Sequence, residues 1–305
     1  MSAPLKALVA LAAAAACACA QGCAGPDGTP QVARVTPVSA QPSSASAATS
    51  PANVATPTPP PYAPPFPALE RGTDAFEPHV SLSGGRRLES REVGRKPSRK
   101  DLKVEADYPV LLGDERPAAR EFNRRVRSLV LDEVTPSLEA GRDPEKEKHP
   151  HWKDVEEYHN VSHKVVYASD ELVSVFFYVE GYSWGAAHGY HRPVTFDFDL
   201  KAGRELQLAR LFKPGSGYLR RLAELCGEDL RRQFGADFAF FTDGLKPEAK
   251  NFDSWVVTRD GLVFIFEEYQ LVAYAQGEPK VLIPFDRLKE MINPRGALAG
   301  VAANQ

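Results

Sequence analysis

The histidines of this chain are its most direct candidates for metal binding or acid–base catalysis, and they cluster in one region. Six of the seven lie between residues 149 and 191. His159 and His163 have the H-x-x-x-H spacing that, on a helix, would point both rings at one metal ion. The second of them opens a β-rich run, and in a strand the two would lie about 13 Å apart at ~3.3 Å per residue. We therefore predict no metal site and no cofactor, with a site that unites His149, His151 and His159 with Glu156 as the open alternative.

A glycine-rich aromatic loop, residues 181–189, carries the most accessible imidazole, that of His188. Between Ala187 and Gly189 this ring could act as an acid, a base or a hydrogen-bond donor. The alternative is a ring that bonds a backbone carbonyl and fixes the loop. No Ser or Cys nucleophile in a G-x-S-x-G-like elbow accompanies it. Exposed aromatic and histidine side chains suit protein or glycan contact, and the predicted ligand-binding residues are Tyr182, Trp184, His188, Tyr190 and His191.

Two further groups of chemically capable residues have simpler interpretations. Asp197 and Asp199 alternate with phenylalanines, which predicts that both carboxylates lie on a solvated strand face. Cys226 lies in a helical pattern of apolar residues, so a buried core position is expected rather than a nucleophile.

The N-terminus predicts export. Lys6 supplies a modest positive charge near the start, and residues 5–16 form a short apolar run that is too short to favour spanning a bilayer. Small residues stand before Cys17 and Cys23, so residues 1–23 are predicted to be a lipoprotein-type signal peptide with lipidation at one of these two cysteines. Cleavage after the A-x-A pattern at residues 18–20 is the competing interpretation, and an uncleaved anchor is the third. The expected location is a membrane-anchored lipoprotein of the bacterial cell envelope, or a secreted or periplasmic protein.

Composition divides the rest of the chain. Residues 24–98 begin as a tract rich in Pro, Ala, Ser and Thr and continue as a polar, basic segment, so we predict a disordered linker or stalk. The globular domain is expected at 99–293, with a leading half at about 99–180, a trailing half at about 190–293 and a flexible tail at 294–305. The net charge of −3, without a Lys/Arg run interleaved with aromatics, argues against nucleic-acid binding.

Periodicity predicts an α+β fold. Alternating runs indicate strands at 102–106, 161–167, 172–179 and 194–200, and a hairpin at 254–266 around an Asp-Gly turn. Amphipathic helices are predicted at 117–134, closed by Pro136, and at 217–234. The expected fold is an antiparallel sheet packed by two longer helices.

Three motifs give a resemblance to a known family. They are the loop at 182–189, the run at 198–212 and the segment from Tyr269 to Pro284; Tyr108-Pro109 and Asn123 fit upstream. Residues 101–292 resemble an extracytoplasmic domain of unknown function found in the lysozyme-sensing anti-sigma factor RsiV and beside the catalytic domain of the deacetylase PdaC. The expected anti-sigma segment, spanning helix and deacetylase domain are not recognised in this sequence. The resemblance implies binding of lysozyme or cell-wall material.

These observations predict an envelope-anchored, non-catalytic binding or sensing module. Its expected partners are lysozyme or peptidoglycan, and the membrane through a lipid anchor. The alternative is a cell-wall hydrolase that uses His188 with a carboxylate not yet placed. A purely structural envelope lipoprotein is a third interpretation.

Overall fold

A computed structural model of the chain describes residues 79–152 and 154–302. The predicted signal peptide, with Cys17 and Cys23, and most of the predicted stalk lie outside these residues. All the described residues belong to one compact unit, Pro59–Gln305. The predicted α+β class is confirmed, although the strands form two sheets rather than one. In the described part of the chain no helix is long and apolar enough to cross a membrane.

The large sheet has seven strands. In spatial order they are β1 (His79–Ser81), β2 (Arg87–Glu92), β3 (Leu102–Leu112), β4 (Glu157–Ala168), β5 (Leu172–Tyr182), β6 (Tyr190–Asp199) and β7 (Arg204–Glu205). Neighbouring strands are antiparallel except β3 and β4, which run parallel. A parallel pair needs a crossover connection, and the long helix α1 (Pro117–Glu139) lies within it.

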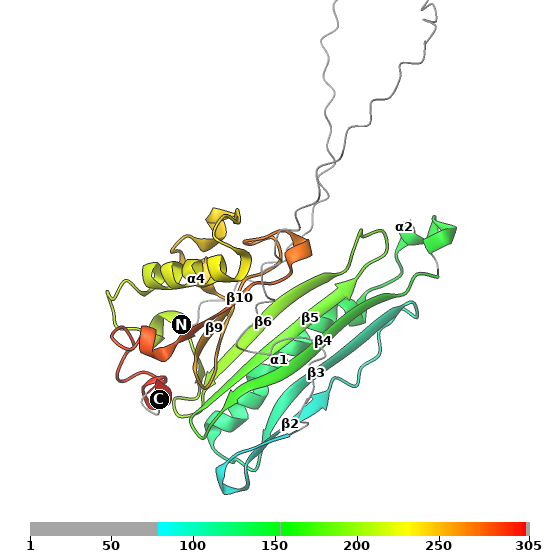
Figure 1. Ribbon diagram of the computed structural model, residues 1–305. Coiled ribbons are helices and arrows are strands. Elements are labelled where there is room, and N and C mark those ends of the chain that lie inside the picture. Colours follow the sequence, from blue (N-terminus) through cyan, green and yellow to red (C-terminus); the bar gives the residue numbers. More distant parts are fainter. Residues whose placement is uncertain (1–78, 153, 303–305) are drawn as a thin grey trace, which may run out of the picture. The chain divides into compact units, whose positions relative to one another are not determined.

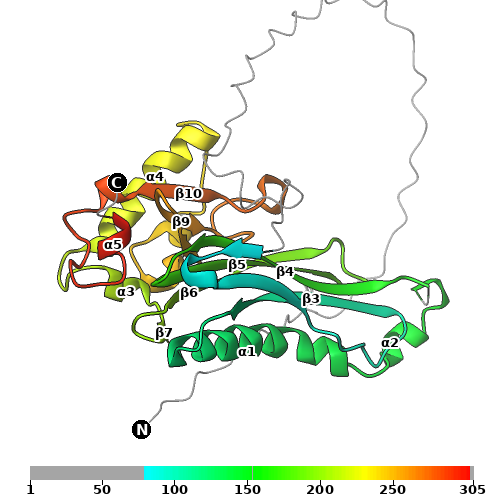
Figure 2. The same ribbon diagram turned by 90° about the horizontal axis from the view of Figure 1, so that it is seen from below.

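Helix α1 covers one face of the large sheet (Figure 2). Its buried side chains recur at helical spacing, from Phe122 through Val126 and Val130 to Leu138, and pack against the buried rings of Phe196 and Phe198. The sequence predicted that Pro136 would close this helix, but the helix continues to Glu139. A proline in the last turn forfeits one backbone hydrogen bond, and the burial of Leu138 offsets that loss.

A small sheet of three antiparallel strands packs on the other face. Its strands, in spatial order, are β10 (Lys280–Pro284), β9 (Gly261–Ile265) and β8 (Trp255–Val257). Phe176 of the large sheet meets Val256, Val263 and Ile265 of the small one in a shared apolar cluster. Helix α4 (Tyr218–Phe234) lies beyond the small sheet and buries Cys226, as predicted, so α1, large sheet, small sheet and α4 form four layers (Figures 1 and 2).

Short helical segments connect these layers. They are α2 (Pro144–Glu147), α3 (Leu208–Leu211), α5 (Ala299–Ala302), η2 (Ser83–Gly85), η3 (Pro150–Trp152), η4 (Thr242–Leu245), η5 (Ala249–Phe252), η6 (Tyr274–Gln276) and η7 (Phe285–Arg287). The predicted flexible tail at 294–305 contains α5, and Leu298 just before it is fully buried in the core around α4.

The structure moves the start of the domain toward the N-terminus. The predicted linker extended to residue 98, yet β1 and β2 lie at 79–92 and form the edge of the large sheet. Leu88 of β2 is 1% exposed in the core under α1. The sequence pattern did not predict β2 as a strand because only one of its six side chains is apolar and buried, whereas the other five are polar.

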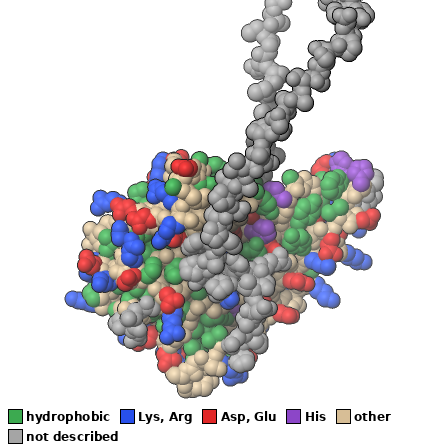
Figure 3. Space-filling view, viewed as in Figure 1, with side chains coloured by type: hydrophobic (Ala, Val, Ile, Leu, Met, Phe, Trp, Pro, Cys, Tyr) green, Lys and Arg blue, Asp and Glu red, His purple; other side chains and the backbone are tan. Residues whose placement is uncertain are grey.

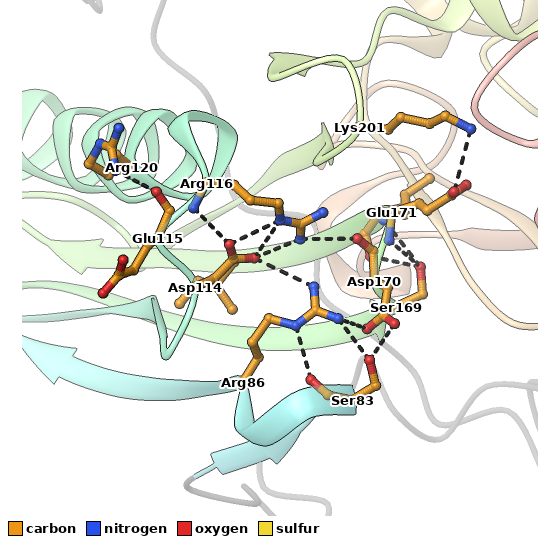
Figure 4. Close-up of polar contacts among 12 residues, drawn as sticks. Ser83, Arg86, Asp114, Glu115, Arg116, Arg120, Ser169, Asp170, Glu171 and Lys201 are labelled. Carbon is orange, nitrogen blue, oxygen red and sulfur yellow. Dashed lines mark hydrogen bonds and ion pairs between the residues drawn. The ribbon is translucent and has the colours of Figure 1, made fainter.

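Polar contacts join the turn before β2 to the turns that follow β3 and β4 (Figure 4). The Asp114 carboxylate accepts from Arg116 at 2.6 Å and lies 3.5 Å from Arg86. Arg86 also pairs with Asp170 at 2.6 Å, in the turn between β4 and β5. The Arg116 guanidinium holds the pKa of Asp114 at about 2, against the opposing effect of burial. Three separate turns are therefore held together by one ionic cluster.

A buried carboxyl joins the two sheets. Asp197 is 4% exposed, so the predicted solvated face is wrong for it: the small sheet covers that face of β6. The backbone N–H of Val257 in β8 donates to Asp197 Oδ1 at 3.1 Å and to Ser174 Oγ at 3.0 Å. Burial raises the pKa of Asp197 to about 7, although the hydrogen bonds with Ser174 and Val257 oppose the rise. The carboxyl therefore titrates near neutral pH at the joint between the sheets.

Replacing Asp197 by Asn should remove a pH dependence of stability. The folded carboxyl binds its proton more tightly than its ordinary pKa of 3.8. Its contribution to stability is therefore complete below the ordinary pKa and is lost as the pH rises toward the folded value. The slope approaches about 1.4 kcal/mol per pH unit. Urea unfolding from pH 4 to pH 8 should show the wild type losing stability relative to Asp197→Asn.

The control is Asp199→Asn, which removes a carboxylate from the same strand outside the joint. Parallel stability curves for the wild type and Asp197→Asn across this pH range would contradict the prediction.

Candidate recognition face

Two segments far apart in the sequence meet beside the joint between the sheets. One is the loop at 183–189 between β5 and β6, and the other is the segment at 266–279 between β9 and β10. The rings of His188 and Tyr274 stack with centroids 3.9 Å apart and planes 29° apart. The Tyr274 hydroxyl donates to the carbonyl of Gly189 at 3.3 Å. The histidine loop and the Tyr269–Pro284 motif of the sequence therefore form one surface.

His191 extends this stack onto the large sheet. Its ring lies nearly parallel to those of Tyr178, at 5.5 Å, and Tyr274, at 6.3 Å. Its Nδ1 lies 2.8 Å from Glu268 Oε1, a contact that links β6 to the loop after β9. We call the set Tyr178, His188, His191, Tyr269 and Tyr274 the aromatic face. Figure 3 shows histidine side chains in the middle of the visible surface, beside hydrophobic ones.

Tyr269 is the most exposed aromatic side chain of the face, at 55%. Its φ of 63° is the only positive φ of a non-glycine residue in the described part of the chain. This left-handed conformation costs a bulky residue about 1–2 kcal/mol. Its hydroxyl lies 3.4 Å from His188 Nε2 and its ring centroid 6.1 Å from that of Tyr274. Neither burial nor backbone preference accounts for a tyrosine at this position.

Glycines allow the loop between β5 and β6 to close this tightly. A Cβ on Gly181 would lie 2.6 Å from the ring of Tyr190, and one on Gly189 would lie 3.0 Å from the carbonyl oxygen of Gly181. Gly185 has a φ of 78°, which side chains rarely adopt. Close packing at Gly181 and Gly189 and the backbone conformation of Gly185 therefore favour glycine in the loop that carries His188.

The structure separates Trp184 and Tyr190 from this face, whereas Tyr182 lies on the same side of β5 as Tyr178 by strand alternation. Trp184 donates its indole N–H to Asp143 Oδ2 at 2.7 Å and lies beside His149 and Trp152, next to α2. Tyr190 points to the opposite side of β6 from His191 and contacts the ring of His159. Burial raises the pKa of the Tyr190 hydroxyl. Tyr182 ends β5 opposite Tyr158.

The remaining histidines have separate partners. His159 is 7% exposed, with Nδ1 2.7 Å from Ser137 Oγ and Nε2 3.4 Å from a Glu133 oxygen under α1. Burial alone would raise the pKa of Glu133, yet His159 and Arg192 lower it to about 2. His149 lies instead beside Trp184. Among the described residues no group of His, Cys, Asp and Glu could hold a metal ion.

Sequence reasoning missed three members of the aromatic face, Tyr178, Tyr269 and Tyr274, and its acidic partner Glu268. Tyr269 and Tyr274 stood in a recognised motif, but only the fold shows that this motif meets His188. Tyr178 lies opposite Pro193 of β6, two residues from the Glu180–His191 pair, so strand register could have suggested its nearness to His191.

Comparison with known proteins supports the resemblance. Residues 209–286 match the family model described as "Protein of unknown function (DUF3298)". The peptidoglycan-N-acetylmuramic acid deacetylase PdaC of Bacillus subtilis is 28% identical over 149 residues, which are 46% of this chain and 32% of PdaC. The chain thus spans about a third of the length of that relative. The predicted relationship to PdaC is confirmed.

Two solved structures are also similar. A DUF3298 family member from Bacteroides fragilis has a TM-score of 0.50 at 17% identity, covering 74% of this chain and all of that chain. A DUF3298 family protein from Pseudomonas aeruginosa has a TM-score of 0.45 at 17% identity, covering 68% of this chain and 93% of that chain. At this identity the first likeness concerns the fold alone.

Replacing Tyr269 by Gly should separate stability from recognition. Glycine adopts a φ of 63° without strain, while the exposed ring contributes little burial, so the free energy of unfolding should stay within about 1 kcal/mol of the wild type or rise. Ligand binding should weaken because the most exposed ring of the face is lost. Tyr269→Phe, which keeps the ring and removes the hydroxyl near His188, is the matched control.

Denaturant unfolding and binding of lysozyme or peptidoglycan, measured on the same preparations, check this prediction. A Tyr269→Gly variant that unfolds easily would show instead that the ring is needed for packing.

Proposed function

We propose that this protein is an envelope-anchored, non-catalytic binding or sensing module that recognises lysozyme or peptidoglycan through the aromatic face. The observation that carries the proposal is the stack of His188 on Tyr274, continued by His191 and Tyr178 and flanked by the exposed Tyr269. Tyrosine and histidine rings present an apolar body with a polar edge, which suits both a sugar face and a protein surface.

The rings of the aromatic face are already held in place without a ligand, which supports a role in binding. Its rings are fixed by hydrogen bonds to Gly189 and Glu268 before any ligand arrives. Fixed side chains lose less rotamer entropy on binding. The relative PdaC is named for action on peptidoglycan, which favours a cell-wall setting for this chain as well.

The geometry of His188 favours binding over the hydrolase alternative. Its Nδ1 lies 2.6 Å from the carbonyl oxygen of Gly189, and its Nε2 lies 3.4 Å from the Tyr269 hydroxyl. Both ring nitrogens thus have partners, and the ring face is covered by Tyr274. A general acid or base needs a nitrogen directed at the substrate. The imidazole is better placed to order the loop and to present an edge for contact.

Replacing Tyr274 by Ala should weaken ligand binding by about tenfold or more, because this ring contacts both histidines and truncation of a central aromatic anchor typically costs about 2 kcal/mol. Calorimetry with lysozyme at two salt concentrations, and co-sedimentation with peptidoglycan, measure the effect. Phe241→Ala, which removes another exposed ring outside the face, should bind normally. Binding of lysozyme that disappears at the higher salt would be only charge attraction to a basic protein.

The same preparations test the hydrolase alternative. Peptidoglycan digestion by the wild type that is lost in His188→Ala would overturn the non-catalytic proposal. Unchanged binding by Tyr274→Ala would remove the aromatic face from it.

The proposed anchor is a lipid on Cys17 or Cys23, in the part of the chain that the structure does not describe. Metabolic labelling with a fatty-acid analogue, followed by membrane fractionation, checks this proposal. One of the two variants Cys17→Ser and Cys23→Ser should lose both the label and the association with membranes. Release of the unlabelled wild type into the soluble fraction would instead support cleavage at residues 18–20 and secretion.

A further inference from the structure

Carboxylates gather around one end of the aromatic face. Glu267 and Glu268 directly precede Tyr269, and Glu278 lies close enough to both to interact with them electrostatically. The side chain of Glu268 is 11% exposed, and Oε1 is the oxygen that His191 binds. Lys280, whose Nζ lies 3.8 Å from a Glu278 oxygen, offsets part of this charge. Rings and negative charge therefore occupy the same small area.

Glu278 is the second, independent observation. Its side chain is 6% exposed, and its buried Oε1 accepts no hydrogen bond from the described residues. Leaving a buried carboxylate oxygen without a donor is costly, and such groups in native structures call for an explanation. Burial raises the pKa of Glu278, as do Glu268 and Glu267, while Lys280 and His191 act in the opposite direction. An added positive charge at this place would reduce the repulsion among the three carboxylates.

The rings would add to the attraction of such a charge. A lysine or arginine group over a tyrosine face is attracted by the negative charge of the ring face, and more strongly where water is excluded. The ring centroids of Tyr269, which directly follows Glu267 and Glu268 in the chain, and of Tyr274 lie 6.1 Å apart, with planes 29° apart. Electron-rich ring faces and carboxylate oxygens together favour a cationic group over a neutral one.

We propose that this end of the aromatic face, formed by Tyr269, Tyr274 and Glu268 with Glu267 and Glu278 around them, is a subsite for a lysine or arginine side chain of a protein partner. The inference rests on the proposed recognition function and names the chemistry of its ligand. A protein is favoured over peptidoglycan because cell-wall glycopeptides carry carboxylates of their own, which three glutamates would repel. Aromatic and acidic surfaces that receive a basic side chain are a common form of protein interface anchor.

The test uses a charged probe and its neutral counterpart on the full chain. Nα-acetyl-arginine methylamide should shift the ring resonances of the tyrosines and histidines of the face in NMR titrations. Nα-acetyl-citrulline methylamide, which has a similar shape without the charge, should bind at least threefold more weakly. Equal binding of the two probes would overturn the subsite.

Variants locate the effect. Glu267→Gln removes an exposed charge and should weaken binding of the arginine probe about two- to fivefold, as expected for one partly solvated carboxylate. Glu268→Gln should weaken binding of the arginine probe more strongly, but it also alters the contact of Glu268 with His191. Glu267→Gln is therefore the variant whose effect on binding does not depend on a change in folding. Glu224→Gln on the exposed side of α4 is the matched control and should leave binding unchanged. An effect of Glu224→Gln equal to that of Glu267→Gln would reduce the attraction to general net charge and overturn the proposal.

Binding of whole lysozyme and of peptidoglycan distinguishes a failure of this subsite from a failure of the proposed recognition function on which it rests. Native lysozyme should bind more tightly than lysozyme with acetylated lysines, and the difference should shrink in Glu267→Gln. If the probes do not discriminate while Tyr274→Ala still weakens lysozyme or peptidoglycan binding, the subsite is wrong and the recognition function stands. If the arginine probe binds as expected but neither macromolecule does, the proposed partners are wrong. Tight binding of an amine-bearing peptidoglycan fragment that Glu267→Gln abolishes would overturn the choice of a protein partner.

Discussion

The large and small sheets are joined by a polar link inside an apolar layer. Residues 196–198 of β6 are buried on both sides, by α1 beneath and by the small sheet above, and Asp197 faces the small sheet with 4% exposure. The Val257 N–H is shared between Asp197 and Ser174, so one backbone donor of β8 is held by two strands of the large sheet. Apolar contacts of Phe176 with Val256, Val263 and Ile265 surround this polar link. Polar pairs in an apolar layer fix register, because any slip leaves them unsatisfied.

The position of the small sheet relative to the large sheet determines where the aromatic face forms. His191 and Tyr178 belong to the large sheet, whereas Glu268, Tyr269 and Tyr274 belong to the segment that connects two strands of the small sheet. The stack therefore exists only when the sheets keep their relative position. The contact of His191 with Glu268 and the stack of His188 on Tyr274 both cross from one sheet's segments to the other's. The proposed recognition by this surface therefore requires that the joint between the sheets is intact.

Local sequence patterns predicted the helices, the main hairpins and the α+β class because these depend on periodic burial along single elements. They failed where burial comes from a partner distant in the sequence. Alternation placed Asp197 in solvent because nothing in residues 194–200 reveals a second sheet above them. The same reasoning assigned β1 and β2 to a linker, since Leu88 alone is fully buried in β2. For the site, glycine spacing identified the loop that carries His188. It could not show that Trp184 turns toward Asp143 or that Tyr190 and His191 point to opposite sides.

The residues that match the family model contain only part of the aromatic face. Residues 209–286 include α4, the small sheet and the segment with Glu268, Tyr269 and Tyr274, but not the loop that carries His188 and His191. The strained Tyr269 thus lies in the matched part, as does Tyr274, and the histidines that stack on Tyr274 come from the preceding loop and from β6. Strain at Tyr269 is tolerated because the strands on either side determine the path of the segment. Under the proposed function, that rigidity would present the ring to a partner at little entropic cost.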